Sequence, residues 1–285
     1  ADLDSGLTTR WTDRTTKPKV AIPSPTPEVE RVPSFDGLSI PALVYHPDAK
    51  KFPGRRPVLM IFHGGPEGQS RPGYRGSFHF YLNELGVALV YPNVRGSTGY
   101  GRRYLALDDG LKREDAIKDV AAVLDWVAKS DRLDASRVAA YGGSYGGFMS
   151  LACLVNYPER FRCGVDNVGI ANFATFLRDT SDYRRGARRL EYGDERKPEV
   201  KAFLDRISPA NHADRIRDPL LIVQGRNDPR VPYTEAERMR DAVKAQGGTV
   251  WYVLAKDEGH GFVKKSNADY QFAATILFLR THLLD

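Results

Sequence analysis

The sequence predicts an α/β protein built on a mostly parallel sheet of about eight strands with helices on both faces. Apolar runs typical of strands alternate with stretches of helical periodicity over residues 35–285, and this alternation favours a parallel sheet. The composition, with 41% hydrophobic and 27% charged residues in a chain of 285, is that of an ordinary globular protein. It excludes disorder, collagen-like repeats and a disulfide-rich scaffold.

The expected strands are short apolar runs, as in the buried strands of parallel sheets. They cover residues 38–46, 57–62, 87–91, 138–141, 220–223 and 250–254, with one more near Cys163. Helices are expected over residues 116–128, 234–245 and 268–284, because apolar residues recur there at helical spacing. A helical cap segment is expected near residues 171–207.

Residues 1–34 are predicted to be an N-terminal extension and a proline-rich linker, followed by one domain over residues 35–285. Five prolines lie between Lys17 and Pro33. Proline fixes φ and removes a hydrogen-bond donor, so this stretch cannot be a helix or a central strand. Residues 7–12 have strand-like composition, but no partner strand lies nearby in the sequence.

Charge and hydropathy restrict the partners. The net charge of +6 is small and dispersed, a weak indication of an anionic partner. A basic run is expected to be a solvated helix face, with an anionic substrate end or a subunit contact as alternatives; it consists of Arg184, Arg185, Arg188 and Arg189. No nucleic-acid recognition motif accompanies it. No apolar window approaches the length of a membrane span. We therefore expect neither nucleic-acid nor membrane binding.

The two cysteines, Cys153 and Cys163, are too few for a disulfide framework and form no zinc-site pattern. Both are expected to be buried thiols. No metal or organic cofactor is expected. Few cysteines and the lack of a leader favour a cytoplasmic location, although the chain begins with Ala rather than Met. A homo-oligomeric assembly is left open.

The strongest chemical signal is Gly142-Gly-Ser-Tyr-Gly-Gly147, which follows a short apolar strand and precedes a helical stretch. This is the context of a nucleophile elbow, in which a serine is exposed on a tight strand-to-helix turn. Cβ atoms at Gly142 and Gly146 would collide with neighbouring backbone in such a turn. Ser144 is therefore the candidate nucleophile, and a glycine-rich turn with an incidental serine is the alternative.

A serine hydroxyl needs a base, and the base needs an acid to orient it. His260 lies on a glycine-flanked loop after the last strand, and Asp228 follows the strand before it. The order Ser144, Asp228, His260 is that of α/β-hydrolases. Asp257 and Glu258 lie too close to His260 in sequence to orient it, so we expect them on the surface.

The oxyanion donors are expected on two backbone segments. His63-Gly-Gly-Pro66 directly follows a strand and is similar to the loop that donates one N–H in esterases, which assigns this role to Gly65. The second donor would be the N–H of Tyr145, at the start of the helix after the nucleophile. His63 as a second general base is the alternative reading of that loop.

Six motifs occur together. They are HGGP at 63–66, NVRGSTGYG at 93–101, GGSYGG at 142–147, EYGD at 191–194, GRNDPRVP at 225–232 and DEGHGF at 257–262. From about residue 30 to its end, the chain resembles the catalytic domain of the prolyl oligopeptidase family of serine peptidases, nearest its acylaminoacyl-peptidase and dipeptidyl-peptidase-like branch. The resemblance implies an α/β-hydrolase fold and an acyl-enzyme mechanism.

The family carries a β-propeller that restricts entry to short peptides, and this chain has no room for one. By resemblance, residues 7–12 match the end of a last propeller strand and the proline-rich stretch matches its linker. The chain is expected to be either a catalytic fragment or a stand-alone hydrolase. By the same resemblance, Arg230 matches an arginine that binds a substrate carbonyl in some relatives; a surface arginine is the alternative.

Aromatic residues near the elbow are candidates for a substrate side-chain pocket, with plain core as the alternative. Tyr192 and Phe148 are the two we assign to substrate binding; the other candidates are Tyr145, Phe173, Phe176 and Tyr183. The sequence thus predicts a serine peptidase that cleaves short peptides or acyl-aminoacyl bonds. A carboxylesterase acting on small esters is the alternative, and a non-catalytic relic of the triad is a third reading.

Overall fold

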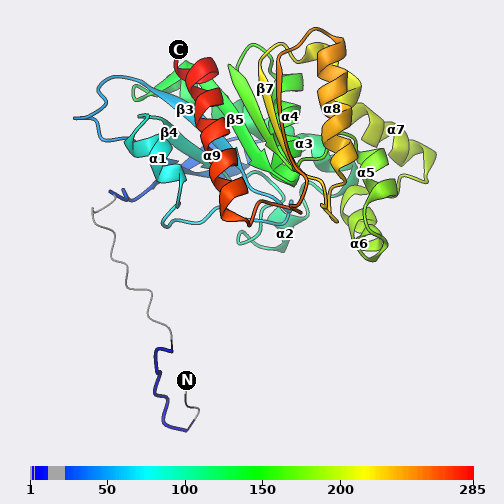
Figure 1. Cartoon of the computed structure of the whole chain (residues 1–285), viewed down its shortest axis with the longest axis horizontal. Coiled ribbons are helices and arrows are strands. Elements are labelled where there is room, and N and C mark those ends of the chain that lie inside the picture. The colour runs from blue at the N-terminus through cyan, green and yellow to red at the C-terminus, as the bar shows by residue number, and fades with distance from the viewer. Residues whose placement is uncertain (1, 3, 12–22) are drawn as a thin grey trace.

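The computed structural model describes residues 2, 4–11 and 23–285, which form an eight-stranded sheet covered by helices on both faces (Figure 1). The strand order is β1-β2-β4-β3-β5-β6-β7-β8, in which β1 and β2 run antiparallel to their neighbours and the rest are parallel. The strands are β1 (Glu28–Pro33), β2 (Ser39–Tyr45), β3 (Arg56–Phe62), β4 (Ala88–Pro92), β5 (Leu133–Gly143), β6 (Cys163–Asn167), β7 (Leu220–Gly225) and β8 (Val250–Ala255). The predicted fold class is confirmed.

The helices fall in two layers and a cap. They are α1 (Phe78–Asn83), α2 (Arg102–Leu105), α3 (Arg113–Lys129), α4 (Tyr145–Asn156), α5 (Phe173–Asp179), α6 (Asp182–Tyr192), α7 (Pro198–Ile207), α8 (Tyr233–Ala245) and α9 (Lys265–Leu279). Two 3₁₀ segments, Gly110–Lys112 and Pro209–Arg215, and a final π turn, Arg280–Leu284, complete them. The expected cap over residues 171–207 is helical, because it contains α5, α6 and α7.

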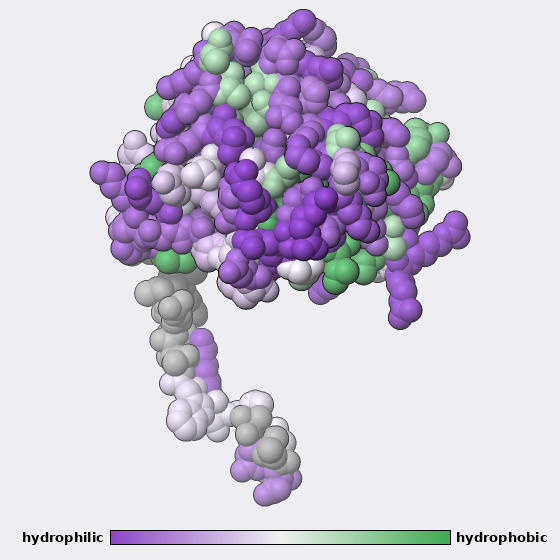
Figure 2. Space-filling view, turned by 90° about the vertical axis from the view of Figure 1, so that its right-hand side faces the viewer, coloured by the Kyte–Doolittle hydropathy of each residue, from purple (hydrophilic) through white to green (hydrophobic). Residues whose placement is uncertain are grey.

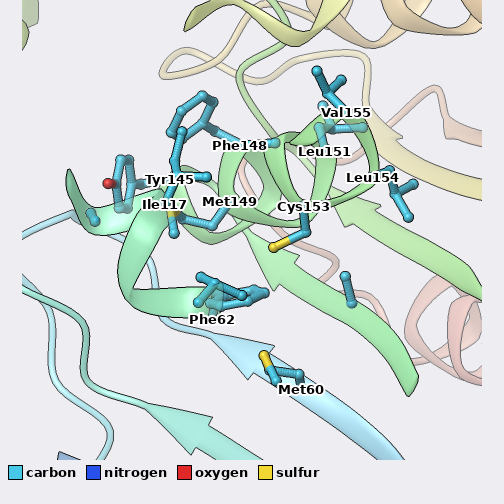
Figure 3. Packing of buried hydrophobic residues seen from close by; sticks show 14 of the residues in the cluster. Met60, Phe62, Ile117, Tyr145, Phe148, Met149, Leu151, Cys153, Leu154 and Val155 are labelled. Atoms are coloured by element: carbon cyan, nitrogen blue, oxygen red, sulfur yellow. The ribbon is translucent and has the colours of Figure 1, made fainter. Parts of the chain in front are cut away.

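The core follows from the two-residue period of the strands, in which successive side chains point to opposite faces. On β3, Met60 and Phe62 belong to the cluster under α3, α4 and α8, whereas Ile61 belongs to the cluster under α1 and α9. Continuous apolar runs are therefore buried on both faces, as the sequence predicts for parallel strands. Figure 3 shows the first cluster, with Met60 and Phe62 below Met149 and Cys153 of α4.

The N-terminal part differs from its prediction. Glu28–Pro33 forms β1, which pairs antiparallel with β2 along its whole length and is an edge strand. The proline-rich stretch was expected to be only a linker. An edge position tolerates the proline at the end of the strand, because one side of an edge strand needs no donors. Residues 7–11 form no strand, residue 12 lies outside the described ranges, and Trp11 is exposed.

The two thiols are buried and unbridged, as predicted, since Cys153 and Cys163 lie in the two clusters on opposite faces of the sheet. Within the described ranges, no helix combines the length and the apolar character needed to cross a bilayer.

Candidate active site

Ser144 lies between β5 and α4 in the tight turn that the sequence predicts. It is half-buried and has a φ of 59°, a conformation that non-glycine residues rarely adopt. A Cβ on Gly146 would lie 2.2 Å from the Phe62 carbonyl oxygen, and one on Gly142 would lie 1.9 Å from the Gly146 carbonyl oxygen. Both positions exclude any side chain. The close approach of β3 and α4 thus holds the serine in a strained turn.

A residue that the sequence analysis did not single out supports this turn from β6. The Asn167 carbonyl oxygen accepts a 2.9 Å hydrogen bond from the Ser144 N–H, and the Asn167 amide group donates to the Gly142 carbonyl at 3.2 Å. Gln271 of α9 in turn donates to the Asn167 side-chain oxygen at 2.8 Å. The one signal in the sequence that could have indicated Asn167 is its position at the carboxyl end of an expected strand.

Asp228 and His260 are in direct contact. Asp228 follows β7 and His260 follows β8, and the His260 Nδ1 atom lies 2.7 Å from the Asp228 Oδ2 atom. The other carboxylate oxygen, Oδ1, accepts from the backbone N–H groups of Arg230 at 2.8 Å and Val231 at 3.0 Å. The buried carboxylate can only accept, so Nδ1 carries a proton and Nε2 is left as the basic nitrogen.

The loop that carries His260 is fixed by Glu258, which we expected on the surface. That prediction is wrong: Glu258 is 2% exposed, and its carboxylate accepts from the Val263 and Lys264 N–H groups at 3.2 and 2.8 Å. These bonds compensate for the cost of burying its charge. Asp257, in contrast, is exposed as predicted. Neither acid is the partner that bonds to the His260 ring nitrogen.

The loop after β3 lies beside the elbow. A Cβ built on Gly64 would be 3.4 Å from the Ser144 Cβ atom, so Gly64 borders the serine, and Gly65 is the next residue of the same loop. Tyr145 is the first residue of α4, where a backbone N–H has no partner within the helix. The Gly65 carbonyl oxygen accepts from the Tyr192 hydroxyl and from the Arg188 Nη1 atom, both at 3.2 Å.

His63 connects two loops. Its Nε2 atom lies 2.8 Å from the Ser97 hydroxyl, and its Nδ1 atom lies 3.0 Å from the Gly64 carbonyl oxygen. Burial lowers the pKa of His63. With both ring nitrogens in contact with loop atoms, His63 has a structural role here, the reading preferred over that of a second base.

The residues assigned to substrate binding lie in different environments. Arg230 is exposed beside Asp228, and its backbone is fixed by the Asp228 carboxylate and by the Thr180 hydroxyl, which donates to its carbonyl at 2.8 Å. Phe148 is 0% exposed and packs edge-on against Phe173 with ring centroids 4.7 Å apart. Tyr192 is 2% exposed. Their contact with a substrate remains a prediction.

The basic run on α6 is not one solvated face. The Arg188 side chain is only 19% exposed, reaches the Gly65 carbonyl and lies 3.6 Å from Glu67. Arg189 pairs with Glu195 at 2.9 Å. The solvated-face prediction therefore fails for these two arginines, because each pairs with a carboxylate outside α6, Arg188 with Glu67 and Arg189 with Glu195. The surface around the cap is mostly hydrophilic, with small separate hydrophobic patches (Figure 2).

Within the described ranges, one acidic group is compact enough to hold a cation, since ligand atoms of Asp108, Asp109 and Glu191 lie within 4.8 Å of one another. The Arg113 guanidinium, however, already contacts Asp108 and lies 2.5 Å from the Glu191 Oε1 atom. A protein cation thus already pairs with two of these three carboxylates, and the group does not fit a metal site.

An α/β-hydrolase fold with a serine on a nucleophile elbow, and an Asp–His pair at the same edge of the sheet, defines the class of serine hydrolases. Comparison with known proteins makes the assignment specific. The model of the prolyl oligopeptidase family matches residues 74–285. The chain therefore belongs to the prolyl oligopeptidase family of serine peptidases.

Its relatives are longer peptidases. The chain is 37% identical to dipeptidyl aminopeptidase BIII of Pseudoxanthomonas mexicana, over 78% of this chain and 33% of that protein. It is 29% identical to the human acylamino-acid-releasing enzyme, over 93% of this chain and 36% of that one. The structure of a puromycin-hydrolyzing peptidase from Mycobacterium tuberculosis superposes with a TM-score of 0.81 at 26% identity, covering 90% of this chain and 39% of that one. The chain thus spans about a third of the length of these curated relatives.

Proposed function

We propose that this chain hydrolyses peptide or acyl-aminoacyl bonds of short peptides through an acyl-enzyme on Ser144. The observation that carries the proposal is the 2.7 Å contact of His260 Nδ1 with Asp228 at the sheet edge that also presents Ser144. A histidine oriented in this way leaves Nε2 to act as the base. The peptidase names of the relatives support peptide bonds as the substrate.

The reaction begins with attack of the Ser144 hydroxyl on the scissile carbonyl carbon while His260 Nε2 takes the hydroxyl proton. Asp228 stabilises the resulting imidazolium through Nδ1. The imidazolium then gives its proton to the leaving amine, and the acyl group stays on Ser144. Water activated by His260 hydrolyses this ester and restores the serine.

The developing oxyanion would be bound by the N–H groups of Gly65 and Tyr145. Tyr145 supplies the first N–H of α4, so the positive end of that helix adds to the stabilisation. Removing one such donor typically costs about 10²–10³-fold in kcat. Arg230, exposed beside the triad acid, is proposed to bind a carbonyl of the substrate backbone.

The test is a matched pair of kinetic assays on the 285-residue chain. One substrate is an aminoacyl or acetyl-aminoacyl anilide, the other a short-chain aryl ester, and Ser144→Ala is the control for both. We expect anilide cleavage that the variant loses, together with labelling of Ser144 by a fluorophosphonate. Ester turnover without amide cleavage would overturn the peptidase assignment in favour of the esterase alternative, and failure to label Ser144 would overturn both.

A further inference from the structure

Helix α6 contacts the oxyanion loop through two side chains that converge on one atom. The Tyr192 hydroxyl and the Arg188 guanidinium both donate to the Gly65 carbonyl oxygen at 3.2 Å. These residues are 127 and 123 positions away from Gly65 in sequence. From this geometry we infer that Tyr192 and Arg188 are positioning residues that aim the Gly65 N–H at the substrate oxyanion.

The Gly65 backbone needs such support. Its φ of +130° is open to glycine alone, and a Cβ there would lie 2.4 Å from the Glu67 nitrogen. Glycine has the largest backbone freedom of any residue, so its N–H direction is not fixed by local sterics. Holding the carbonyl oxygen from two directions restricts ψ at Gly65 and, through the chain, the plane of the preceding peptide that carries the N–H. An oxyanion donor contributes most when it is already aimed before the reaction.

Tyr192 is itself fixed from several sides. Its ring lies 4.9 Å from that of Phe173, 5.9 Å from that of Phe176 and 6.3 Å from that of Tyr145, measured between centroids. With 2% of its surface exposed, the phenol has little room to turn. Its hydroxyl is therefore a rigid donor rather than a mobile one.

Arg113, the first residue of α3, connects Tyr145, which carries one oxyanion N–H, with Tyr192, which holds the Gly65 carbonyl. Its guanidinium lies 5.1 Å from the Tyr145 ring and 4.9 Å from the Tyr192 ring, so one cation contacts both aromatic faces. It also donates to the Glu191 carbonyl at 3.1 Å, which ties down the last turn of α6. The side chain is 1% exposed. Figure 3 shows Tyr145 in the first turn of α4, close to the core under the elbow.

This inference rests on the proposed function, because the Gly65 N–H matters only if the site forms an oxyanion. It also changes the role of Tyr192: the residue acts through the oxyanion loop instead of holding the substrate side chain. The two roles differ in what they predict. A substrate contact contributes to KM, whereas an aimed donor contributes to the transition state and thus to kcat.

The test uses Tyr192→Phe, which removes only the hydroxyl, and Arg188→Met, which removes the guanidinium but keeps a long side chain. Tyr270→Phe is the matched control, because Tyr270 lies on α9, has no assigned role in the site and is 66% exposed. Each test variant is expected to lose about 10-fold in kcat and the double variant about 100-fold, within the range for one oxyanion donor. KM should stay within about twofold of wild type. A peptide aldehyde forms a tetrahedral adduct with the serine. Its inhibition constant should rise by the same factor by which kcat/KM falls.

Hydrogen exchange supplies a readout that does not depend on turnover. Backbone amides of residues 62–70 should exchange faster in the double variant than in wild type and should be unchanged in Tyr270→Phe. Arg188→Lys, which keeps a donor, should recover part of the lost kcat.

The outcomes separate the inference from the proposed function. A raised KM with unchanged kcat in Tyr192→Phe would assign Tyr192 to substrate binding and overturn the inference. Wild-type kinetics and wild-type exchange rates in the double variant would also overturn the inference. In both cases the proposed function still holds as long as turnover depends on Ser144. If the wild-type chain neither turns over substrate nor labels at Ser144, the proposed function fails and the role of the Gly65 N–H fails with it.

Discussion

Replacing Asp228 with Asn tests the Asp–His pair most sharply, because the contacts dictate how the new side chain sits. The Asp228 Oδ1 atom accepts from two backbone N–H groups, those of Arg230 and Val231. In Asp228→Asn the amide oxygen must keep that place, since an NH₂ group there would face two donors. The amide NH₂ then points at His260 Nδ1, which has to become an acceptor.

The consequence is a histidine with its proton on the wrong nitrogen. Nε2 would carry the proton and could not take one from Ser144. This tautomer change typically lowers kcat about 10⁴-fold in a serine triad, or about 5 kcal/mol in activation free energy. Stability should change little, by about 1 kcal/mol or less, because the two backbone hydrogen bonds are retained.

The assay is anilide hydrolysis by wild type, Asp228→Asn and the control Asp257→Asn, with thermal unfolding of each. Asp257 is the exposed acid three residues before His260 and pairs with Lys264 at 2.5 Å. Its replacement should change kcat by no more than about twofold, since exposed ion pairs contribute little. The reasoning is refuted if Asp228→Asn keeps more than about a tenth of wild-type kcat, or if Asp257→Asn produces the large loss instead.

Three further outcomes are expected. Gly146→Ala places a Cβ 2.2 Å from the Phe62 carbonyl oxygen. We therefore expect a loss of about 1–3 kcal/mol in unfolding free energy and slower fluorophosphonate labelling of Ser144. Wild-type values for both would contradict the close contact between Gly146 and Phe62. Burial raises the pKa of Asp166 from 3.8 to about 7, so the folded chain binds more protons than the unfolded chain between these values and stability falls as pH rises through them. In Asp166→Asn, the unfolding free energy from denaturant titrations should fall less steeply between pH 4 and 8 than in wild type. An unchanged pH dependence would contradict the raised pKa of Asp166. Burial also raises the pKa of the Cys163 thiol, so neither Cys163 nor Cys153 should react with a thiol reagent until the chain unfolds; rapid native-state reaction of either would contradict their burial.

Much of the fold could be predicted from local pattern. The apolar runs at 57–62 and 220–223 became β3 and β7 within a few residues, because a strand buried on both faces is a continuous apolar run. The elbow could also be predicted, since only glycine fits at Gly146, where any Cβ would lie 2.2 Å from the Phe62 carbonyl oxygen of β3. Asp228 and His260 followed from their places after successive strands, and the structure brings those two together.

The errors came where the folding of a loop or the position of a strand in the sheet decides the environment of a residue. Glu258 looked like a surface acid until the backbone N–H groups of Val263 and Lys264 were seen to fold back on it. The segment before residue 34 looked like a linker because its prolines forbid a central strand, yet an edge position beside β2 permits one.

The sequence by itself determined the α/β architecture, the turn that exposes Ser144 and the order of the groups around it, because each depends on neighbours within one strand, turn or helix. Only the tertiary structure decided which charged side chains are buried and which distant residues they contact. Arg188 and Tyr192 reach Gly65 across more than 120 residues, and Arg113 lies against rings on α4 and α6. A charged side chain is buried only where the fold supplies partners that offset the loss of water, and those partners have no fixed spacing along the chain.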